Sequence, residues 1–437
     1  MNRRNFVQTL SAGSAGLVLA NPLFAFGGMP AKKIVMAVSG TNSRGLFLAK
    51  MFARLPDVEV AYICDVDEAV LLKTASEVEA ITGKRPKLIR DYRKLVEIKE
   101  IDAVAIAMPD HWHAPAALMA AAAGKHVYVE KPCGHNPAEG EMLVQAAAKY
   151  GVLIQMGNQR RSFPNLKEGI QAMHEGIIGN VYFAKGWYAN NRKSIGKGQL
   201  VTVPAGLDFE LWQGPAPRMP FRSNLVHYNW HWFWHWGTGE ALNNGTHEID
   251  VMRWGLDVKH PVKVTSAGGR YAFQDDWETP DTQVITLEFP NGKAMTWEGR
   301  SCNNLPIEGS GRGVIFYGTT GSMIYPGGDE FSFYDMDNKL IKAWKSSEVV
   351  DAANPISPFE RLDVGHLENF VAAIRGESGL NSPIAEGYAS TLLPMLGNIA
   401  QRSGKTLICD PATGRPNDAD ALKLWSRSYQ PGWEMKL

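Results

Sequence analysis

Residues 33–45 read KIVMAVSGTNSRG and join a run of apolar residues to a loop bounded by two glycines. The apolar run is typical of a buried parallel strand, and the loop predicts a tight turn into a helix. Gly40 permits the turn and Gly45 permits close approach of helix and strand, while Asn42 stands where such loops commonly carry a further glycine. The N-terminus of a helix that starts in this way faces the phosphates of a dinucleotide, so the stretch predicts a nucleotide-binding α/β fold.

A second strand-like run, Val58 to Ile63, leads to Asp65. A carboxylate at the end of the second strand of such a fold can accept hydrogen bonds from both ribose hydroxyls. It also repels a 2′-phosphate, which favours NAD over NADP. The alternative is that Asp65 only caps the following helix. The place of Asp65 after the glycine loop favours the cofactor role.

A further strand-like run, His126 to Val129, ends at Glu130, Lys131 and Pro132. Open α/β sheets bind ligands at the carboxyl ends of their strands, where a lysine is costly to bury. Proline biases the preceding residue towards an extended backbone and so orients the Lys131 side chain. Lys131 is therefore predicted to contact a ligand; the alternative is a solvated lysine in a turn.

Another strand end carries two histidines, His111 and His113, soon after Pro109. Both are predicted to contact nucleotide or substrate, with packing as the alternative. No carboxylate cluster is obvious near them in the sequence, so no metal site is predicted. The four cysteines form no CxxC pair and are interpreted as free thiols or core residues.

Strand-like and helical segments alternate as far as residue 157, which predicts a parallel, doubly wound sheet. Beyond it, strand-like runs separated by turn signals predict a mostly antiparallel sheet. Helices are expected at Leu362 to Arg375 and at Ile384 to Arg402. The expected domains are residues 31–157, the nucleotide-binding domain, and 158–405, an α+β substrate domain. Residues 406–437 are expected to be a C-terminal surface extension.

The charges balance, with 45 lysines and arginines against 45 aspartates and glutamates, so nothing favours nucleic acid or an anionic membrane as a partner. Residues 1–30 combine Arg3 and Arg4 with a short, weakly apolar stretch and a small-residue exit. This segment resembles a twin-arginine export signal and predicts a periplasmic protein; a disordered cytoplasmic tail is the alternative. No other segment is long enough to span a membrane.

Four tryptophans, Trp230, Trp232, Trp234 and Trp236, fall at every second residue. An extended segment would place all four indoles on one face, as a wall for stacking sugars; core packing is the alternative.

Directly after the tryptophans, Asn243 and His247 stand four residues apart and are predicted to share a helix face. A neutral histidine suits the removal of a hydroxyl proton as hydride leaves; the alternative is a capped or core histidine.

The glycine loop, Asp65, the Glu-Lys-Pro motif and the block from Gly237 to His247 occur in the order seen in the Gfo/Idh/MocA oxidoreductase family, which this chain resembles over residues 31–405. The resemblance implies an N-terminal Rossmann domain and a C-terminal α/β domain with an open-faced sheet, which commonly packs against another subunit. A homo-oligomer, dimer or tetramer, is therefore expected. It also implies that Lys131 contacts substrate and nicotinamide ribose, and that His247 is the general acid/base.

Many family members carry aspartate where this chain has Asn243. An asparagine can orient a hydroxyl, but it supplies no charge to raise the basicity of a neighbour.

The expected function is transfer of a hydride between tightly bound NAD and a hydroxyl-bearing carbon of a sugar, glycoside or cyclitol. Two alternatives stay open: redox-neutral, NAD-assisted glycoside cleavage, and a non-catalytic sugar-binding protein that retains NAD. The residues expected to hold NAD are Gly40, Asn42, Ser43, Arg44, Gly45, Asp65, Pro109, His111, His113, Glu130 and Lys131. Those expected to contact the sugar are Lys131, Arg160, Tyr228, Trp230, Trp236, Asn243 and His247, with Lys131, His247 and Asn243 as the catalytic set.

Overall fold

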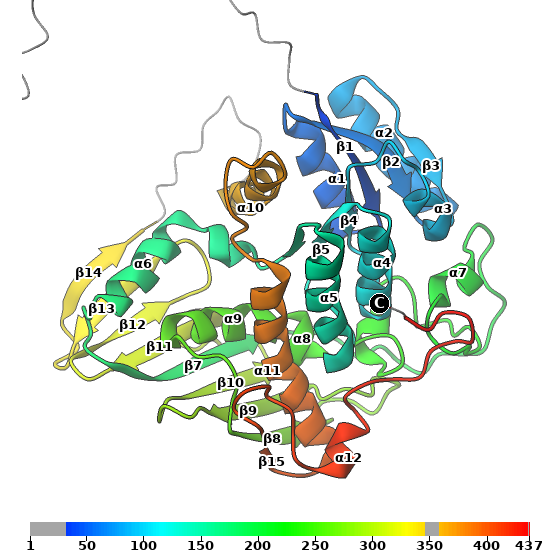
Figure 1. Ribbon diagram of the computed structural model, residues 1–437. Helices are drawn as coiled ribbons and strands as arrows, with labels where there is room; N and C mark the ends of the chain where they lie inside the picture. Colours follow the sequence, from blue (N-terminus) through cyan, green and yellow to red (C-terminus); the bar gives the residue numbers. More distant parts are fainter. Residues whose placement is uncertain (1–31, 346–357, 436) are drawn as a thin grey trace, which may run out of the picture. The chain divides into compact units, whose positions relative to one another are not determined.

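The first part of the chain builds a six-stranded, all-parallel sheet in a computed structural model that describes residues 32–345, 358–435 and 437 (Figure 1). The strand order is β3-β2-β1-β4-β5-β6, the order of a doubly wound dinucleotide-binding fold, which confirms the predicted fold class. The strands are β1 (Ile34–Ser39), β2 (Val58–Cys64), β3 (Lys87–Ile89), β4 (Ala103–Ile106), β5 (His126–Val129) and β6 (Ile154–Met156). The predicted export signal, residues 1–30, lies outside the described residues.

Helices connect these strands and cover the sheet, as continuous apolar strands require. All four residues of β4 are buried. The helix after β2 is capped by Asp67, whose side chain accepts from the backbone N–H groups of Ala69 and Val70, and it ends at Gly83 with a φ of 73°. The helices are α1 (Arg44–Arg54), α2 (Glu68–Thr82), α3 (Tyr92–Val96), α4 (Asp110–Ala122) and α5 (Pro137–Tyr150).

The second sheet has nine strands in the order β14-β13-β12-β11-β7-β10-β9-β8-β15. All its neighbouring strands pair antiparallel except β7 and β10, so the predicted mostly antiparallel sheet is confirmed. Strands β12, β14 and β15 were not predicted. The strands are β7 (Val181–Ala189), β8 (Lys263–Gly269), β9 (Thr282–Glu288), β10 (Ala294–Arg300), β11 (Arg312–Gly318), β12 (Gly321–Tyr325), β13 (Phe331–Asp335), β14 (Leu340–Trp344) and β15 (Leu407–Ile408).

Helices pack on one face of the second sheet, with α9 crossing β7 and α11 lying against β8 (Figure 1). Buried and less buried residues alternate along β9 and β10, as expected for a sheet covered on one face. The remaining helices and 3₁₀ turns are η1 (Gln159–Ser162), α6 (Pro164–His174), α7 (Phe209–Gln213), η2 (Asn229–Trp232), α8 (Glu240–Asn243), α9 (Gly245–Leu256), α10 (Pro358–Ile374), α11 (Ile384–Ser403) and α12 (Ala419–Leu422). Among the described residues, no helix is both long and apolar enough to cross a membrane.

The tryptophan-rich segment is not extended, so the prediction of one indole face is wrong. Residues Asn229–Trp232 form a 3₁₀ turn, which points successive indoles in different directions. Trp232 is buried and stacks on Trp277 with ring centroids 4.0 Å apart. Core packing, the alternative interpretation, describes this side chain.

Two C-terminal segments pack on the parallel sheet rather than away from it. Phe370 of α10 is fully buried in the same core cluster as Phe52 of α1. The tail, expected to be a surface extension, returns to α4, where the Trp433 and Trp112 rings lie 5.2 Å apart. Arg427 of the same tail donates to the backbone oxygen of His111 at 2.6 Å.

Because Phe370 joins α10 to the parallel sheet, Phe370→Ala should lower the free energy of unfolding by about 3–5 kcal/mol. Chemical denaturation followed by tryptophan fluorescence measures the change. Phe273→Ala is the matched control, since Phe273 is 37% exposed and its loss leaves no cavity. Equal effects of the two substitutions would show that α10 is not part of the core.

Candidate active site

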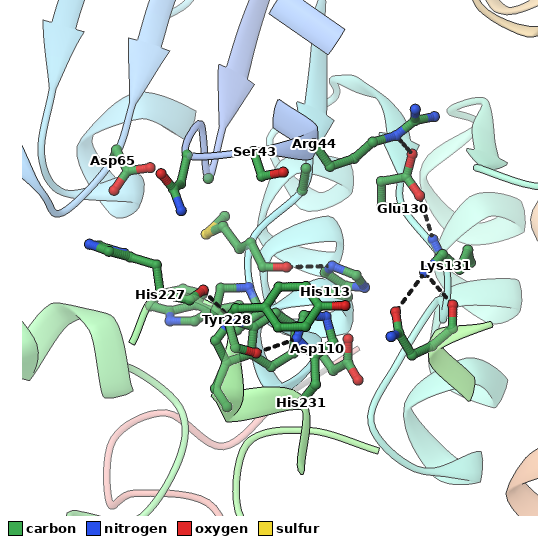
Figure 2. A pocket seen from close by; sticks show the side chains of 18 of the residues that line it. Ser43, Arg44, Asp65, Asp110, His113, Glu130, Lys131, His227, Tyr228 and His231 are labelled. Atoms are coloured by element: carbon green, nitrogen blue, oxygen red, sulfur yellow. Dashed lines mark hydrogen bonds and ion pairs between the residues drawn. The ribbon is translucent and has the colours of Figure 1, made fainter. Parts of the chain in front are cut away.

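A cavity of about 420 Å³ opens at the carboxyl edge of the parallel sheet, where residues of the second sheet and its helices complete the wall (Figure 2). The predicted site residues that line it are Gly40, Asn42, Ser43, Arg44, Asp65, Pro109, Glu130, Lys131, His113, Arg160, Tyr228, Trp230, Asn243 and His247. Gly45, His111 and Trp236 are not among the lining residues. Residues from motifs far apart in the chain therefore line one cavity.

The glycine loop between β1 and α1 leaves no room for a side chain at either end. Gly40 has a φ of 75°, and a Cβ on it would lie 2.5 Å from the backbone nitrogen of Met108. A Cβ on Gly45 would lie 2.0 Å from the Gly40 oxygen, so Gly45 tightens the loop without lining the cavity. Ser43 and Arg44, at the start of α1, border the cavity. This is the geometry that lets a helix N-terminus approach a pyrophosphate.

Asp65 follows β2 at the same edge and caps no helix through its side chain. Its Oδ2 accepts a hydrogen bond from the Thr41 backbone N–H at 2.6 Å, and its Oδ1 accepts one from the Asp67 N–H at 3.1 Å. Burial raises the pKa of Asp65 above its usual value, while those two N–H groups oppose the shift. Asp67, not Asp65, caps α2.

A loop from the second half of the chain borders the Asp65 end of the cavity. The Asp208 N–H donates to the Val66 oxygen at 3.0 Å, and the Glu68 N–H donates to the Gly206 oxygen at 3.2 Å. His227, labelled in Figure 2, lies 3.2 Å from the Asp67 carboxylate. The segment from Gly206 to Tyr228 is thereby tied to the end of β2.

Glu130 does not stand free at the end of β5. Its Oε1 accepts from Arg44 Nε at 2.6 Å (Figure 2). Arg44 Nη1 donates to Asp363 at 2.6 Å. Burial alone would favour the neutral acid, but Arg44 and Lys131 hold the pKa of Glu130 below its usual value. Glu130 therefore places a negative charge between Arg44 and Lys131.

Lys131 points across the cavity to the second half of the chain. Its Nζ donates to the backbone oxygen of Asn243 at 2.6 Å and to Asn243 Oδ1 at 3.3 Å. Burial lowers the pKa of Lys131 below its usual value, against the opposing charges of Glu130 and Asp110. The ammonium is thus held at one position in the cavity wall.

Behind Asn243 lies a buried carboxylate, Glu240. Asn243 Nδ2 donates to Glu240 Oε1 at 3.2 Å, which turns Asn243 Oδ1 towards Lys131. Arg192 Nε donates to Glu240 Oε2 at 2.6 Å. The negative charge that Asn243 lacks is therefore carried by Glu240, which contacts Asn243 on the side away from Lys131.

His247 and Asn243 both line the cavity, although they do not share one continuous helix. Helix α8 ends at Asn243 and α9 begins at Gly245. Burial lowers the pKa of His247 well below its usual value, and the charges of Arg160 and Lys131 add to the shift. The imidazole is neutral at neutral pH and suited to accept a proton.

A second imidazole borders the cavity beside Tyr228 and Trp230. His231 stacks on Trp230 with ring centroids 3.6 Å apart, and its Nδ1 lies 2.6 Å from the backbone oxygen of Tyr228. Burial lowers the pKa of His231 to about 3, so this ring is neutral. Tyr228 is 47% exposed and reaches the cavity beside it (Figure 2).

Of the two histidines after Pro109, only His113 lines the cavity. Its ring nitrogens each lie 2.6 Å from a carbonyl oxygen, those of Pro132 and Met108. His111 is fully buried, with Nε2 3.0 Å from the Trp212 oxygen. The packing alternative therefore describes His111.

Trp236 is also placed by packing. It is 3% exposed and packs in an aromatic cluster, 5.6 Å between ring centroids from Trp212. Trp212 lines the cavity, but Trp236 does not. Arg312 and Asp363, by contrast, line the cavity and were not predicted. They come from β11 and α10, and no local pattern around either residue marks a ligand site.

The residues present fit NAD. The glycine loop leaves space where a Cβ would collide, the start of α1 borders the cavity, and Asp65 supplies a carboxylate at the end of β2. Asp65 and Gly40 would hold the adenosine and pyrophosphate portions. Among the described residues, no group of three or more histidine, cysteine or acidic side chains is placed to hold a metal ion.

Comparisons with known proteins agree with this geometry. Residues 34–158 match the family described as an oxidoreductase family with an NAD-binding Rossmann fold, and residues 213–324 match the GFO/IDH/MocA C-terminal domain. The oxidoreductase YrbE of Bacillus subtilis is 30% identical over 295 residues, which cover 67% of this chain and 73% of YrbE.

A glycosyl hydrolase family 109 protein of Stenotrophomonas maltophilia is 31% identical over 206 residues, covering 45% of this chain and 44% of that protein. The chain thus aligns with less than half of that relative's length. The WlbA dehydrogenase of Bordetella pertussis, solved with NADH and UDP-GlcNAcA, has the same fold. Its TM-score is 0.63 at 19% identity, over 87% of this chain and 99% of WlbA.

The two matched domains, in this order and on this fold, together with the YrbE alignment, show that the chain belongs to the Gfo/Idh/MocA family of NAD-binding oxidoreductases.

Proposed function

We propose that the protein is an NAD-dependent oxidoreductase that acts on a hydroxyl-bearing carbon of a sugar, glycoside or cyclitol. The observation that carries the proposal is that Lys131 and His247, from the two halves of the chain, line the same cavity as the glycine loop and Asp65. Polar donors and a neutral imidazole beside a nucleotide site suit oxidation of an alcohol.

NAD, when bound, supplies the acceptor for the hydride that leaves the carbinol carbon. His247 takes the hydroxyl proton, because its imidazole is neutral and unprotonated at neutral pH. The Lys131 ammonium donates a hydrogen bond to the same oxygen and stabilises the charge that develops there. Asn243 holds the ammonium in place through its backbone oxygen, at 2.6 Å.

The runner-up is redox-neutral cleavage of a glycoside, and the family 109 relatives favour it by name. In that reaction the oxidised carbon acidifies the neighbouring C–H, which loses its proton as the glycosidic oxygen takes up a proton and leaves. Water then adds across the double bond so formed, and the hydride returns to the carbonyl carbon. The same residues would serve, since His247 and Lys131 are required for the first oxidation. No external oxidant is consumed.

Purification of the protein without added nucleotide, followed by addition of sugars and glycosides, separates these functions. Stoichiometric growth of the NADH absorbance band without aglycone release supports the oxidoreductase. Aglycone release without net NADH supports the glycoside-cleaving enzyme. If NAD binds and neither reaction occurs with any sugar that binds, the protein is a sugar-binding protein that retains NAD.

Export and assembly are proposed on narrower grounds. Residues 1–30, with Arg3 and Arg4, support twin-arginine export to the periplasm, where a tightly held cofactor is needed. A homo-oligomer through the outer face of the second sheet is supported by apolar residues on it, Tyr182 at 47% and Val284 at 38% exposure. Light scattering and fractionation of periplasm test both proposals.

Lys131→Met should reduce turnover by at least about 100-fold while bound NAD remains, because the substitution removes the ammonium and leaves the glycine loop intact. Turnover and the nucleotide released on denaturation are measured in the same preparation. Full activity in Lys131→Met would contradict the assigned role, and loss of NAD would show a cofactor-binding role instead.

Asp65→Ser should weaken NAD binding by about tenfold or more and reduce the discrimination against NADP, because it removes the carboxylate that favours ribose hydroxyls over a 2′-phosphate. Fluorescence titrations of the nucleotide-free protein with NADH and with NADPH give both affinities. An unchanged ratio of the two affinities would refute the cofactor role of Asp65.

Asn243→Asp should shift the alkaline limb of the pH profile of kcat/KM upwards by about one to three units. The side-chain oxygen of residue 243 lies 3.3 Å from Lys131 Nζ, so a carboxylate there raises the lysine pKa. The active ammonium is deprotonated as pH rises through that pKa, so a higher pKa moves the loss of activity to higher pH. Asn303→Asp, at an exposed asparagine outside the cavity, is the control. An unmoved limb in Asn243→Asp would show that Lys131 does not titrate in it.

A further inference from the structure

Two arginines border the cavity near His247 and share a single carboxylate. Arg160 Nη1 donates to Glu248 Oε1 at 2.9 Å. Arg312 approaches the same oxygen with Nε at 3.0 Å and Nη2 at 2.9 Å. Glu248 is fully buried next to His247 on α9, whereas Arg160 and Arg312 are among the residues that line the cavity. The group therefore holds two positive charges and one negative charge.

The neighbouring acids do not neutralise the second positive charge. Asp250 is bound by Arg161, whose Nε and Nη2 lie 2.8–3.1 Å from it. Asp363 is bound by Arg44 at 2.6 Å. Among the described residues Asp329 pairs with neither arginine, and its Oδ1 accepts from the Leu166 N–H at 3.1 Å, at the start of α6.

Tyr325, beneath Arg160, is not an anion either, because burial raises its pKa to about 12. The guanidinium of Arg160 lies 5.7 Å from the centre of the Tyr325 ring, and that of Arg312 lies 5.2 Å from the centre of the Tyr188 ring. Stacking and the shared carboxylate thus hold both groups in fixed orientations, and one positive charge remains without a partner among the described residues.

The guanidinium groups also keep unused donors. Within the described residues, Arg160 makes its one side-chain hydrogen bond through Nη1, and Arg312 makes its one through Nε. The remaining N–H groups belong to side chains that border the cavity. Paired guanidinium groups with free edges are the usual protein partners of carboxylates. A triad that only tied α9 to β11 would not need to face a cavity.

We propose that Arg160 and Arg312 form a carboxylate-binding subsite, so that the substrate is an acidic sugar such as a uronic acid. The assignment rests on the proposed function and names the substrate class for it. A single uncompensated positive charge matches a carboxylate better than the dianion of a phosphate ester. The subsite adjoins His247, so binding the acid group orients the rest of the sugar towards His247 and Lys131.

The test compares matched sugars on the NAD-loaded protein: glucuronate with glucose, galacturonate with galactose, and glucose 6-phosphate as the phosphate arm. Calorimetry measures binding, and the NADH absorbance band measures oxidation. In at least one pair the acid should bind at least about tenfold more tightly than its neutral partner, and more tightly than the phosphate ester. Added salt should weaken binding of the acid.

Arg312→Gln should bring the ratio of acid to neutral affinity close to one, and Arg312→Lys should restore part of it. Arg300→Gln is the matched control, because Arg300 pairs with Glu298 at 2.8 Å at the end of β10 and does not line the cavity. The control should keep the wild-type ratio. If Arg312→Gln fails to fold, the proposal is judged from the ratio of acid to neutral affinity in the wild-type protein and in Arg312→Lys.

The outcomes separate the subsite from the proposed function. Equal binding of acid and neutral sugars, or tighter binding of the phosphate ester, overturns the subsite, while NADH formation from a neutral sugar still supports the oxidoreductase. Tight, Arg312-dependent binding of the acid without NADH formation or cleavage supports the subsite and contradicts the enzyme. Retention of the acid preference in Arg312→Gln also overturns the subsite.

Discussion

The hydrogen bond from Lys131 Nζ to the backbone oxygen of Asn243, 2.6 Å long, joins the parallel sheet to the helices of the second sheet in the wall of the cavity. A buried ammonium is costly, and Glu130, Asp110 and Glu240 supply the negative charge that stabilises it. The register of β5 beside β4, and of β4 beside β1, sets Lys131 on the same edge as the glycine loop. Cofactor site and proton-transfer groups therefore share one wall.

The asparagine at position 243 changes how charge is distributed around that lysine. With aspartate there, the carboxylate would touch the ammonium directly. In this chain the carboxylate belongs to Glu240, which contacts Asn243 Nδ2 at 3.2 Å and is bound on its other side by Arg192 at 2.6 Å. The amide thus orients Lys131 without pairing with its charge, and the lysine pKa stays below its usual value. Lys131 therefore loses its proton at a lower pH than an exposed lysine does.

Much of the fold and part of the site could be predicted from sequence, because the motifs that mark them lie within a few residues of a strand end. Gly40, Asp65 and Lys131 each follow a strand, and parallel strands bring their carboxyl ends to one edge. The histidine pair shows where local signals fail. Helix α4 begins at Asp110 and so contains both histidines, and residues two apart on a helix are rotated by about 200° relative to each other. His113 therefore reaches the cavity and His111 packs against Trp212.

Arg312 and Asp363 show a second limit of sequence patterns, since long-range packing alone brings β11 and α10 to the cavity.

The central claim, that the two halves of the chain form one catalytic site, is tested most directly by a double-mutant cycle. The rate of hydride transfer in a single turnover is measured for Lys131→Met, His247→Asn and the double variant. The account predicts that the two losses do not multiply, because both side chains act on one hydroxyl group. Losses that multiply fully would show that Lys131 and His247 act independently and would contradict it.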